Sequence, residues 1–229
     1  MSDLIETSGA CGKCGHEFGF EYWASINIKL DPKLKDKLLD GELNVITCPN
    51  CQNRSALAAD LLYHDMERRL WLQLTFSENI DEYIENGNRA LADLEIMSGD
   101  IGKQMSFGYK RRVVSSYPDL IEKIMVFDEE MDDQVLELTK LFLKAKLHSE
   151  GDQIDEALYF NRIMMHPEDP KLKIILFNDS LWAPYNEFYE SLEKTLESFD
   201  LNSDSSLRVV DERFAGKMLN ELRMRRRDT

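Results

Sequence analysis

Cys11-Gly12-Lys13-Cys14 and Cys48-Pro49-Asn50-Cys51 are the two stretches that decide the fold of this 229-residue chain. They contain all four of its cysteines, as two Cys-x-x-Cys pairs with a long insert between them. Each pair can form a tight turn that points both sulfurs the same way, and Gly12, Gly15 and Pro49 are residues that such turns favour. Two such pairs suit one tetrahedral metal ion. The spacing therefore predicts one zinc ion per chain, bound by Cys11, Cys14, Cys48 and Cys51.

The four cysteines also admit other interpretations. A catalytic zinc keeps one coordination position open for water or substrate, whereas four thiolates fill every position, so we expect a structural zinc. A thioredoxin-like redox pair requires a Cys-x-x-Cys that opens a helix after a strand, and neither pair is placed in that way. Disulfides are the third alternative. The residues before Cys11 show no signal peptide, which disfavours them.

The composition favours some classes of protein over others. Hydrophobic residues make up 43% of the chain, as in a globular protein, and no apolar run reaches membrane-spanning length. Reduced, metal-paired cysteines are typical of the cytosol, so we expect a cytoplasmic protein. The net charge is −15. Nucleic-acid binding depends on cations that displace counterions from phosphate, so the charge predicts a protein partner rather than nucleic acid, and the lack of a long apolar run predicts no membrane partner.

The insert between the two cysteine pairs predicts a strand followed by a helix. From Phe18 to Leu30 the apolar residues occupy alternate positions, which is typical of a long strand with one buried face. Asp31 and Pro32 then predict the start of a helix, with Asp31 as its N-cap and Pro32 at its first position, and Gly41 predicts its end. The insert therefore predicts a long strand and a short helix between the two pairs.

The residues on either side of the cysteine pairs complete a small predicted sheet. Segments 56–63 and 70–76 alternate as strands do, and residues 64–68 would form the turn of their hairpin. Residues 1–10 are expected to be a loose lead-in. The first third of the chain is thus predicted as a small sheet clamped by zinc.

The first third also resembles a known family. The resemblance lies in the first cysteine pair, the alternating aromatic strand, Asp31–Gly41, Thr47–Cys51 and Leu61–Met66. Together they resemble the CpXC domain, a bacterial and archaeal family named for two Cys-Pro-x-Cys motifs. The chain departs from that pattern at Gly12, where the name implies proline, and at Gln52, where a glycine is common. The resemblance covers residues 8–76 and implies a zinc site and the fold, without adding a reaction.

The middle of the chain predicts a domain boundary. Residues 77–96 show helical spacing that is interrupted at residues 86–88, so two helices are expected. Three glycines then lie between residues 98 and 109, where we expect a linker. The predicted domains are a zinc-ribbon-like CpXC domain with a helical extension at residues 1–97 and an α+β domain at residues 110–229.

The second half predicts helices around a small sheet, so the fold class of the whole chain is α+β. The predicted strands and helix starts follow from alternation and from prolines or acidic caps. These are strands at 111–115, 158–165, 172–177 and 209–210, and helices that begin at Pro118, Asp132 or Asp133, Pro184 and near Ala215. An aromatic stripe from Tyr185 to Phe199 is expected to lie in the core.

Other residues that could be catalytic or bind a ligand have simpler structural explanations. His64-Asp65 could form a catalytic pair, but adjacent residues on a strand usually point apart, so we expect both residues to have a structural role in the hairpin. His16 could replace a metal ligand, but four cysteines already fill the site. The acidic cluster from Asp128 to Asp133 lacks calcium-loop spacing and is expected to be a solvated loop with a helix start. The arginine-rich end, Arg223–Arg227, is expected to complement a helix C-terminus.

These patterns predict a zinc-binding, non-enzymatic protein with a structural four-cysteine site that acts in protein interaction, as an adaptor or regulator. The sequence has no phosphate-binding glycine loop, Gly-x-Ser-x-Gly or His-Glu-x-x-His motif. One alternative is an enzyme whose C-terminal half brings two titratable side chains together in a pocket. The other is a nucleic-acid-binding regulator that gathers its cations on one face. Candidate cations are Arg68, Arg69, Arg111, Arg112 and the C-terminal arginines.

Overall fold

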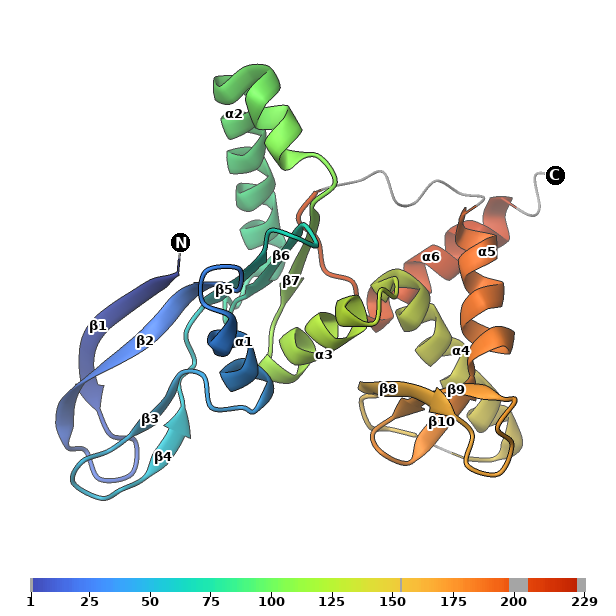
Figure 1. Ribbon diagram of the computed structural model, residues 1–229, viewed down its shortest axis with the longest axis horizontal. Helices are drawn as coiled ribbons and strands as arrows, with labels where there is room; N and C mark the ends of the chain where they lie inside the picture. The colour runs from blue at the N-terminus through green and yellow to red at the C-terminus, as the bar shows by residue number, and fades with distance from the viewer. Residues whose placement is uncertain (1, 153, 198–205, 226–229) are drawn as a thin grey trace. The chain divides into compact units, whose positions relative to one another are not determined.

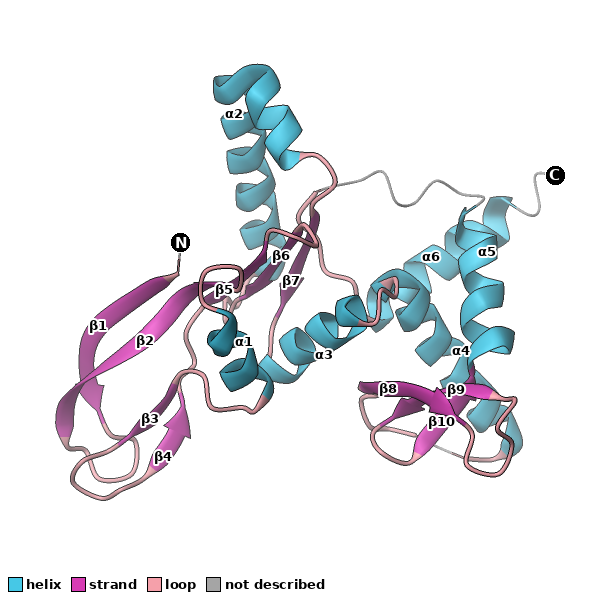
Figure 2. Ribbon diagram, in the orientation of Figure 1, coloured by secondary structure: helices cyan, strands magenta, loops and turns pink. Residues whose placement is uncertain are grey.

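The computed structural model describes residues 2–152, 154–197 and 206–225 (Figure 1). The chain divides into two compact units, which we call the N-terminal unit (residues 1–121 with 205–207) and the C-terminal unit (residues 122–204 with 208–229). Helices and mixed sheets make both units α+β, as predicted (Figure 2).

A five-stranded mixed sheet forms the N-terminal unit. Its strands, in spatial order, are β1 (Asp3–Ala10), β2 (Glu17–Asn27), β5 (Leu61–Asp65), β6 (Leu70–Leu74) and β7 (Lys110–Val114). The pairs β1–β2 and β5–β6 are antiparallel, whereas β2–β5 and β6–β7 are parallel. The expected hairpin is confirmed as β5 and β6, but its bounds differ, because His64 and Asp65, which were expected in the turn, belong to β5, and residues 57–60 lie outside any strand. Residues 1–10 were predicted as a loose lead-in, which is wrong, because Asp3–Ala10 is a paired strand whose mostly exposed side chains leave no apolar alternation.

The sheet is unevenly supported. Its buried apolar side chains lie at the end of β2 and on β5, β6 and β7, and they are Ile26, Leu61, Tyr63, Leu70, Leu72, Leu74, Val113 and Val114. By contrast, β2 pairs with β5 only through Ser25, Ile26 and Asn27, so the rest of β1 and β2 forms a two-stranded ribbon. A two-stranded ribbon is marginally stable in water by itself. The far end of this ribbon therefore needs another source of stability, and it is there that Cys11 lies.

The predicted short helix is α1 (Pro32–Leu39), and it buries Leu34 and Leu38. Pro32 occupies its first turn, and Gly41, with φ +69°, ends it as expected. Asp31 stands at the N-cap position but makes no side-chain cap. Its carboxylate instead accepts a hydrogen bond from the Ser2 hydroxyl at 2.5 Å.

The second cysteine pair lies in a two-stranded antiparallel sheet of β3 (Val45–Thr47) and β4 (Arg54–Ala56). This sheet is tied to the ribbon by Asn44, which is buried and has φ +56°. The Asn44 side chain accepts a hydrogen bond from the Trp23 amide at 2.8 Å and donates one to the Trp23 carbonyl at 2.9 Å. Asn44 thereby satisfies both backbone groups of a β2 residue, as a neighbouring strand would.

Helix α2 (Ile80–Ser106) differs from the prediction in two ways. It continues through residues 86–88, where a break was expected, because that stretch packs on Leu207. A Cβ on Gly87 would lie 2.8 Å from the Leu207 side chain, and the Asn88 side chain bonds both the amide and the carbonyl of Leu207, at 2.7 and 3.0 Å. The backbone within α2 becomes non-helical at Gly99 (φ 59°, ψ −140°).

The predicted domain bounds of 1–97, 98–109 and 110–229 also differ from the structure. Most of the predicted linker is helical, since α2 runs to Ser106. The boundary between the compact units falls after Ile121, inside α3 (Tyr117–Asp128). The glycines that suggested a linker instead allow a bend at Gly99 and close packing at Gly102, whose Cβ would lie 2.5 Å from that of Ser98.

The C-terminal unit surrounds a three-stranded antiparallel sheet of order β10-β9-β8. Beyond α3, its elements are α4 (Asp133–Glu150), β8 (Phe160–Met165), β9 (Lys173–Phe177), β10 (Leu181–Pro184), a π-helical turn (Tyr185–Glu190), α5 (Ser191–Glu197) and α6 (Glu212–Arg225). The hairpin of β8 and β9 and the starts of α3 and α4 agree with the prediction. Strand β10 was missed, and the predicted strand at residues 209–210 is wrong, because neither residue is in a strand.

The aromatic stripe contributes to the core of the C-terminal unit, as predicted. Tyr189 is 1% exposed, and Tyr185 and Phe188 pack against the same cluster. Phe199, the last residue of the predicted stripe, lies outside the described residues.

Candidate metal centre

The two cysteine pairs have the same backbone turn. In the first pair, the Gly15 amide donates to the Cys11 carbonyl at 2.8 Å, and the Cys11 amide donates to the His16 carbonyl at 2.9 Å. In the second pair, the Gln52 amide donates to the Cys48 carbonyl, and the Cys48 amide donates to the Asn53 carbonyl, both at 2.9 Å. Each turn directs its backbone amides toward the sulfurs that it carries.

The residue after each pair adopts a left-handed backbone. Gly15 has φ +71° and Gln52 has φ +57°. Glycine adopts this conformation freely, whereas a residue with a side chain is strained in it. Gln52 is therefore the strained member of the two turns, although its side-chain amide donates a hydrogen bond to the Pro49 carbonyl at 3.1 Å.

We expect Gln52→Gly to stabilise the N-terminal unit by about 0.5–1 kcal/mol, because the relief of left-handed strain outweighs the extra chain entropy that glycine loses on folding. Urea unfolding of the metal-loaded protein, followed by tryptophan fluorescence, measures the change. The mirror substitution, Gly15→Gln, should destabilise the unit by a similar or larger amount. Equal stability of the Gln52→Gly variant and the wild type would contradict this account of the turn.

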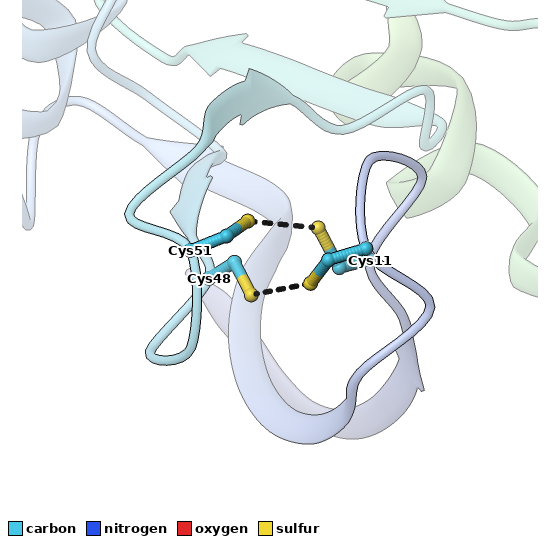
Figure 3. Close-up of side chains that lie close together, drawn as sticks. Cys11, Cys48 and Cys51 are labelled. Atoms are coloured by element: carbon cyan, nitrogen blue, oxygen red, sulfur yellow. Dashed lines mark hydrogen bonds between the residues drawn. The ribbon is translucent and has the colours of Figure 1, made fainter.

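The turns bring all four sulfurs together (Figure 3). Cys11 Sγ lies 3.7 Å from Cys51 Sγ, and Cys14 Sγ lies 3.7 Å from Cys48 Sγ. All four sulfurs are within 4.8 Å of one another. A tetrahedron with metal–sulfur distances of about 2.3 Å has edges of about 3.8 Å, whereas a disulfide requires about 2.05 Å. The distances fit four thiolates around one metal ion and do not fit a pair of disulfides.

Local hydrogen bonds favour the thiolate form of the first pair. The His16 backbone amide, with help from the Asn50 side chain at 3.6 Å, lowers the pKa of Cys14 to about 6. The backbone amides of Cys14 and Lys13 likewise lower the pKa of Cys11. A metal ion binds the thiolate, so these amides prepare both cysteines as ligands.

The four cysteines share hydrogen bonds, and Cys51 is the one that these bonds hold in the protonated form. The Asn53 amide acts to lower the pKa of Cys51, but burial and the three neighbouring cysteines outweigh it and raise this pKa to about 12. A divalent cation at the centre would displace the Cys51 proton and replace these hydrogen bonds by metal–sulfur bonds. The four residues together therefore have the chemistry of a metal site.

A comparison with family models places this site in a known group. The model described as "CpXC protein" matches residues 10–140, which include all four cysteines and more than half of the chain. The chain belongs to the CpXC protein family. This confirms the resemblance found in the sequence and extends it from residue 76 to residue 140. Searches of curated proteins and of solved structures found no significant match.

The histidines near the CpXC sheet have structural partners. His16 lies outside the group of potential ligands, and its ring stacks on Phe18. His64 and Asp65 do not form a pair. Asp65 is 2% exposed and accepts hydrogen bonds from the amides of its own turn, whereas His64 bonds the Tyr109 hydroxyl at 2.9 Å. Burial lowers the pKa of His64.

The acidic cluster was expected to be solvated, which is only partly correct. Asp132 caps α4 by accepting a hydrogen bond from the Gln134 amide at 2.8 Å. Asp133, however, is 0% exposed and lies 3.3 Å from the Lys123 ammonium group. Among the described residues, the cysteines form the one group with the geometry of a metal site.

Asp133 belongs to a buried ionic network between α3 and α4. Lys140 lies 2.7 Å from a Glu122 oxygen and 3.0 Å from a Glu137 oxygen, and Lys123 lies 3.3 Å from Glu137. All five charged side chains are less than 10% exposed. Sequence reasoning did not find this network, because its members are separated by up to 18 residues and follow no local motif.

The arginines that could have formed a basic strip lie in different environments. Arg111 and Arg112 pair with β6 on strand β7 and are buried. Arg68 bridges to Asp65, and the Arg69 side chain donates to the Phe107 carbonyl. Arg226 and Arg227 of the C-terminal end lie outside the described residues. Across the described residues, no helix is both long and apolar enough to cross a membrane.

Proposed function

We propose that this CpXC protein is a zinc-stabilised, non-enzymatic protein that binds another protein, as an adaptor or regulator. The observation that carries the proposal is the closed set of four cysteine sulfurs, all within 4.8 Å of one another. Zinc is the metal proposed, because four thiolates in a tetrahedron are its usual structural ligands. A set with no open position serves structure rather than catalysis.

The place of the site supports a structural role. Cys11 lies at the end of the β1–β2 ribbon, and the second pair lies between β3 and β4. One ion would therefore hold together two small β elements that lack a large core of their own. A ribbon stiffened in this way can present its backbone and side chains to a partner with little ordering cost on binding.

The enzyme alternative has less support than the binding proposal. It requires titratable side chains that converge in a pocket and face a substrate. The charged side chains that do converge in the C-terminal unit are those of the buried network, and they pair with one another in the interior. Internal pairing of this kind accounts for the convergence without a substrate.

The nucleic-acid alternative also has less support. The net charge of −15 opposes a polyanion, and Arg111 and Arg112 are buried. We expect neither DNA nor RNA to shift in gel-shift titrations at physiological salt. Binding at physiological salt that disappears when Arg225, Arg226 and Arg227 are replaced by Ala would instead favour the nucleic-acid alternative. A cytoplasmic location is part of the proposal.

Affinity purification of the tagged full-length chain from its native host tests the proposed function. We expect one or a few proteins to be enriched with the wild type and to be lost with Cys48→Ser, which removes a metal ligand. Thr47→Ser, a neighbouring exposed change that keeps all four ligands, is the matched control and should retain them. Enrichment of no protein, or equal enrichment with Cys48→Ser, would contradict the proposal.

A further inference from the structure

Exposed apolar side chains gather at the far end of α2. We call residues 94–107 the α2 tip. Five of its large apolar side chains are 58–83% exposed, and they are Leu94, Ile96, Met97, Ile101 and Phe107. A monomeric soluble protein rarely exposes so many large apolar groups within one short stretch, and such clusters are typical of interaction sites.

The way α2 is anchored explains why the tip is uncovered. The first half of the helix is held by Leu207, through Gly87 and Asn88. At Gly99 the chain bends, and Gly102 packs so closely that its Cβ would lie 3.5 Å from Glu95 Cα. Gly102 therefore packs on the turn that contains Glu95 and Ser98, and the five apolar side chains stay exposed. Figure 1 shows the bend of α2 at the end of the helix that points away from β5, β6 and β7 of the same unit.

The charges around the tip indicate what kind of partner it fits. At the tip, Glu95 interacts with Arg111, and the Arg69 and Arg111 side chains donate to the backbone of Phe107 and Ser106. Helix α2 as a whole is nevertheless acidic, because it carries two cations, Arg89 and Lys103, against six carboxylates, which are Asp81, Glu82, Glu85, Asp93, Glu95 and Asp100. Asp93 and Asp100 are exposed beside the apolar side chains. A second copy of the tip would bring like charges together, and an anionic membrane would repel them. An apolar surface flanked by Lys and Arg would complement both the apolar groups and the carboxylates.

We propose that the α2 tip is a docking site for a protein partner that presents an amphipathic helix flanked by basic residues. This inference rests on the proposed function and names the surface that carries it. Leu94 and Met97 are three residues apart on one helical face, as anchors are in helix-to-helix recognition, and Ile101 extends them beyond the bend. Met97 is the most exposed of the five, and its flexible side chain adapts to partners of different shape.

A defined pair of probes tests the site on the full-length, metal-loaded protein. One probe is a fluorescent synthetic helix of Leu and Lys, about 18 residues long, in an amphipathic pattern, and the other has Glu in place of Lys. We expect fluorescence anisotropy at physiological salt to show binding of the Leu/Lys helix and none of the Leu/Glu helix. The triple variant Leu94→Ser, Met97→Ser, Ile101→Ser should weaken binding by about tenfold or more, since anchors carry most of the affinity.

Two control variants separate the apolar and the electrostatic contributions. Leu4→Ser with Leu30→Ser removes two exposed apolar side chains of the same unit outside the tip, and it should leave binding unchanged. Asp93→Asn with Asp100→Asn should weaken binding and reduce its salt dependence. All of these positions are exposed, so circular dichroism should show every variant folded.

Several results would overturn the inference. Equal binding of the Leu/Lys helix by the triple variant would mean that only the net charge attracts it. Wild-type dimerisation in sedimentation velocity that the triple variant loses would make a second copy the occupant. If the wild type binds phosphatidylcholine–phosphatidylglycerol vesicles and the triple variant does not, the occupant of the α2 tip is a lipid surface.

The same triple variant distinguishes this inference from the proposed function. It is taken through the affinity purification beside the wild type, and we expect it to lose the proteins that the wild type enriches. If the triple variant retains these proteins, the partner binds elsewhere, so the inference about the α2 tip is wrong and the proposed function stands. If the wild type enriches no protein, the proposed function fails whatever the synthetic helices do.

Discussion

Replacing Cys48 by Ser is expected to unfold the part of the N-terminal unit that holds the four cysteines. Cys48 is 2% exposed and its sulfur lies 3.7 Å from Cys14 Sγ, so its loss opens a site that has no spare ligand. Because a metal ion binds the folded site and not the open chain, its binding energy is largely folding energy. Hydrogen exchange measured by mass spectrometry should increase by about 100-fold or more across residues 8–56.

The C-terminal unit supplies an internal reference for that experiment. It has its own core, so exchange in α4 and β9 should be unchanged in the variant. Thr47→Ser should exchange like the wild type throughout, and chelator treatment of the wild type should reproduce the pattern of Cys48→Ser. Loss of protection in α4 would instead mean that the two units unfold together, and an unchanged N-terminal unit would mean that the metal site does not stabilise it.

Replacing Lys140 by Met is expected to cost the C-terminal unit about 3–5 kcal/mol of unfolding free energy, because it removes the ammonium group bonded to buried Glu122 and leaves Glu137 with Lys123 alone. Lys140 is 8% exposed and lies within 3.0 Å of both Glu122 and Glu137. Lys144→Met is the matched control one helical turn away. Its partner Glu212 is 61% exposed, so this pair should contribute less than about 1 kcal/mol.

The destabilisation by Lys140→Met should depend on pH. Burial raises the pKa of Glu122 even with Lys140 beside it, and removing the ammonium group raises it further. An acid whose folded-state pKa is raised destabilises the folded state once the pH exceeds the unfolded-state pKa, and this cost disappears as the acid becomes protonated. Urea unfolding should therefore show a deficit that is largest at neutral pH and shrinks toward acidic pH. A loss of unfolding free energy that is the same at neutral and at acidic pH would contradict the ionic explanation.

The sequence predicted the metal site because the site is built from two local motifs. Each Cys-x-x-Cys turn follows from its own few residues, and two such turns commonly bind one metal ion. The alternation of β2, and the proline and glycine at the two ends of α1, were equally local signals. Sequence reasoning missed Asn44, because a single polar residue with φ +56° gives no periodic signal, although it ties the β3–β4 sheet to Trp23.

The errors arose where distant residues decide the structure. Gly87 and Gly102 were interpreted as helix breakers, but they are sites of close approach to Leu207 and Ser98, which local sequence does not show. Strand β1 has little apolar pattern and forms because β2 supplies its partner. Asp133 was expected in solvent, and it is buried because Lys123, on a different helix, pairs with it.

Metal content of the purified protein tests the central claim most directly. The full-length chain is purified under reductant without chelator, and its metals are measured by inductively coupled plasma mass spectrometry beside a titration of thiols. We predict about one zinc per chain, with the thiols of Cys11, Cys14, Cys48 and Cys51 becoming fully reactive only when a chelator is added. A folded protein that carries almost no metal and has four freely reactive thiols would contradict the account.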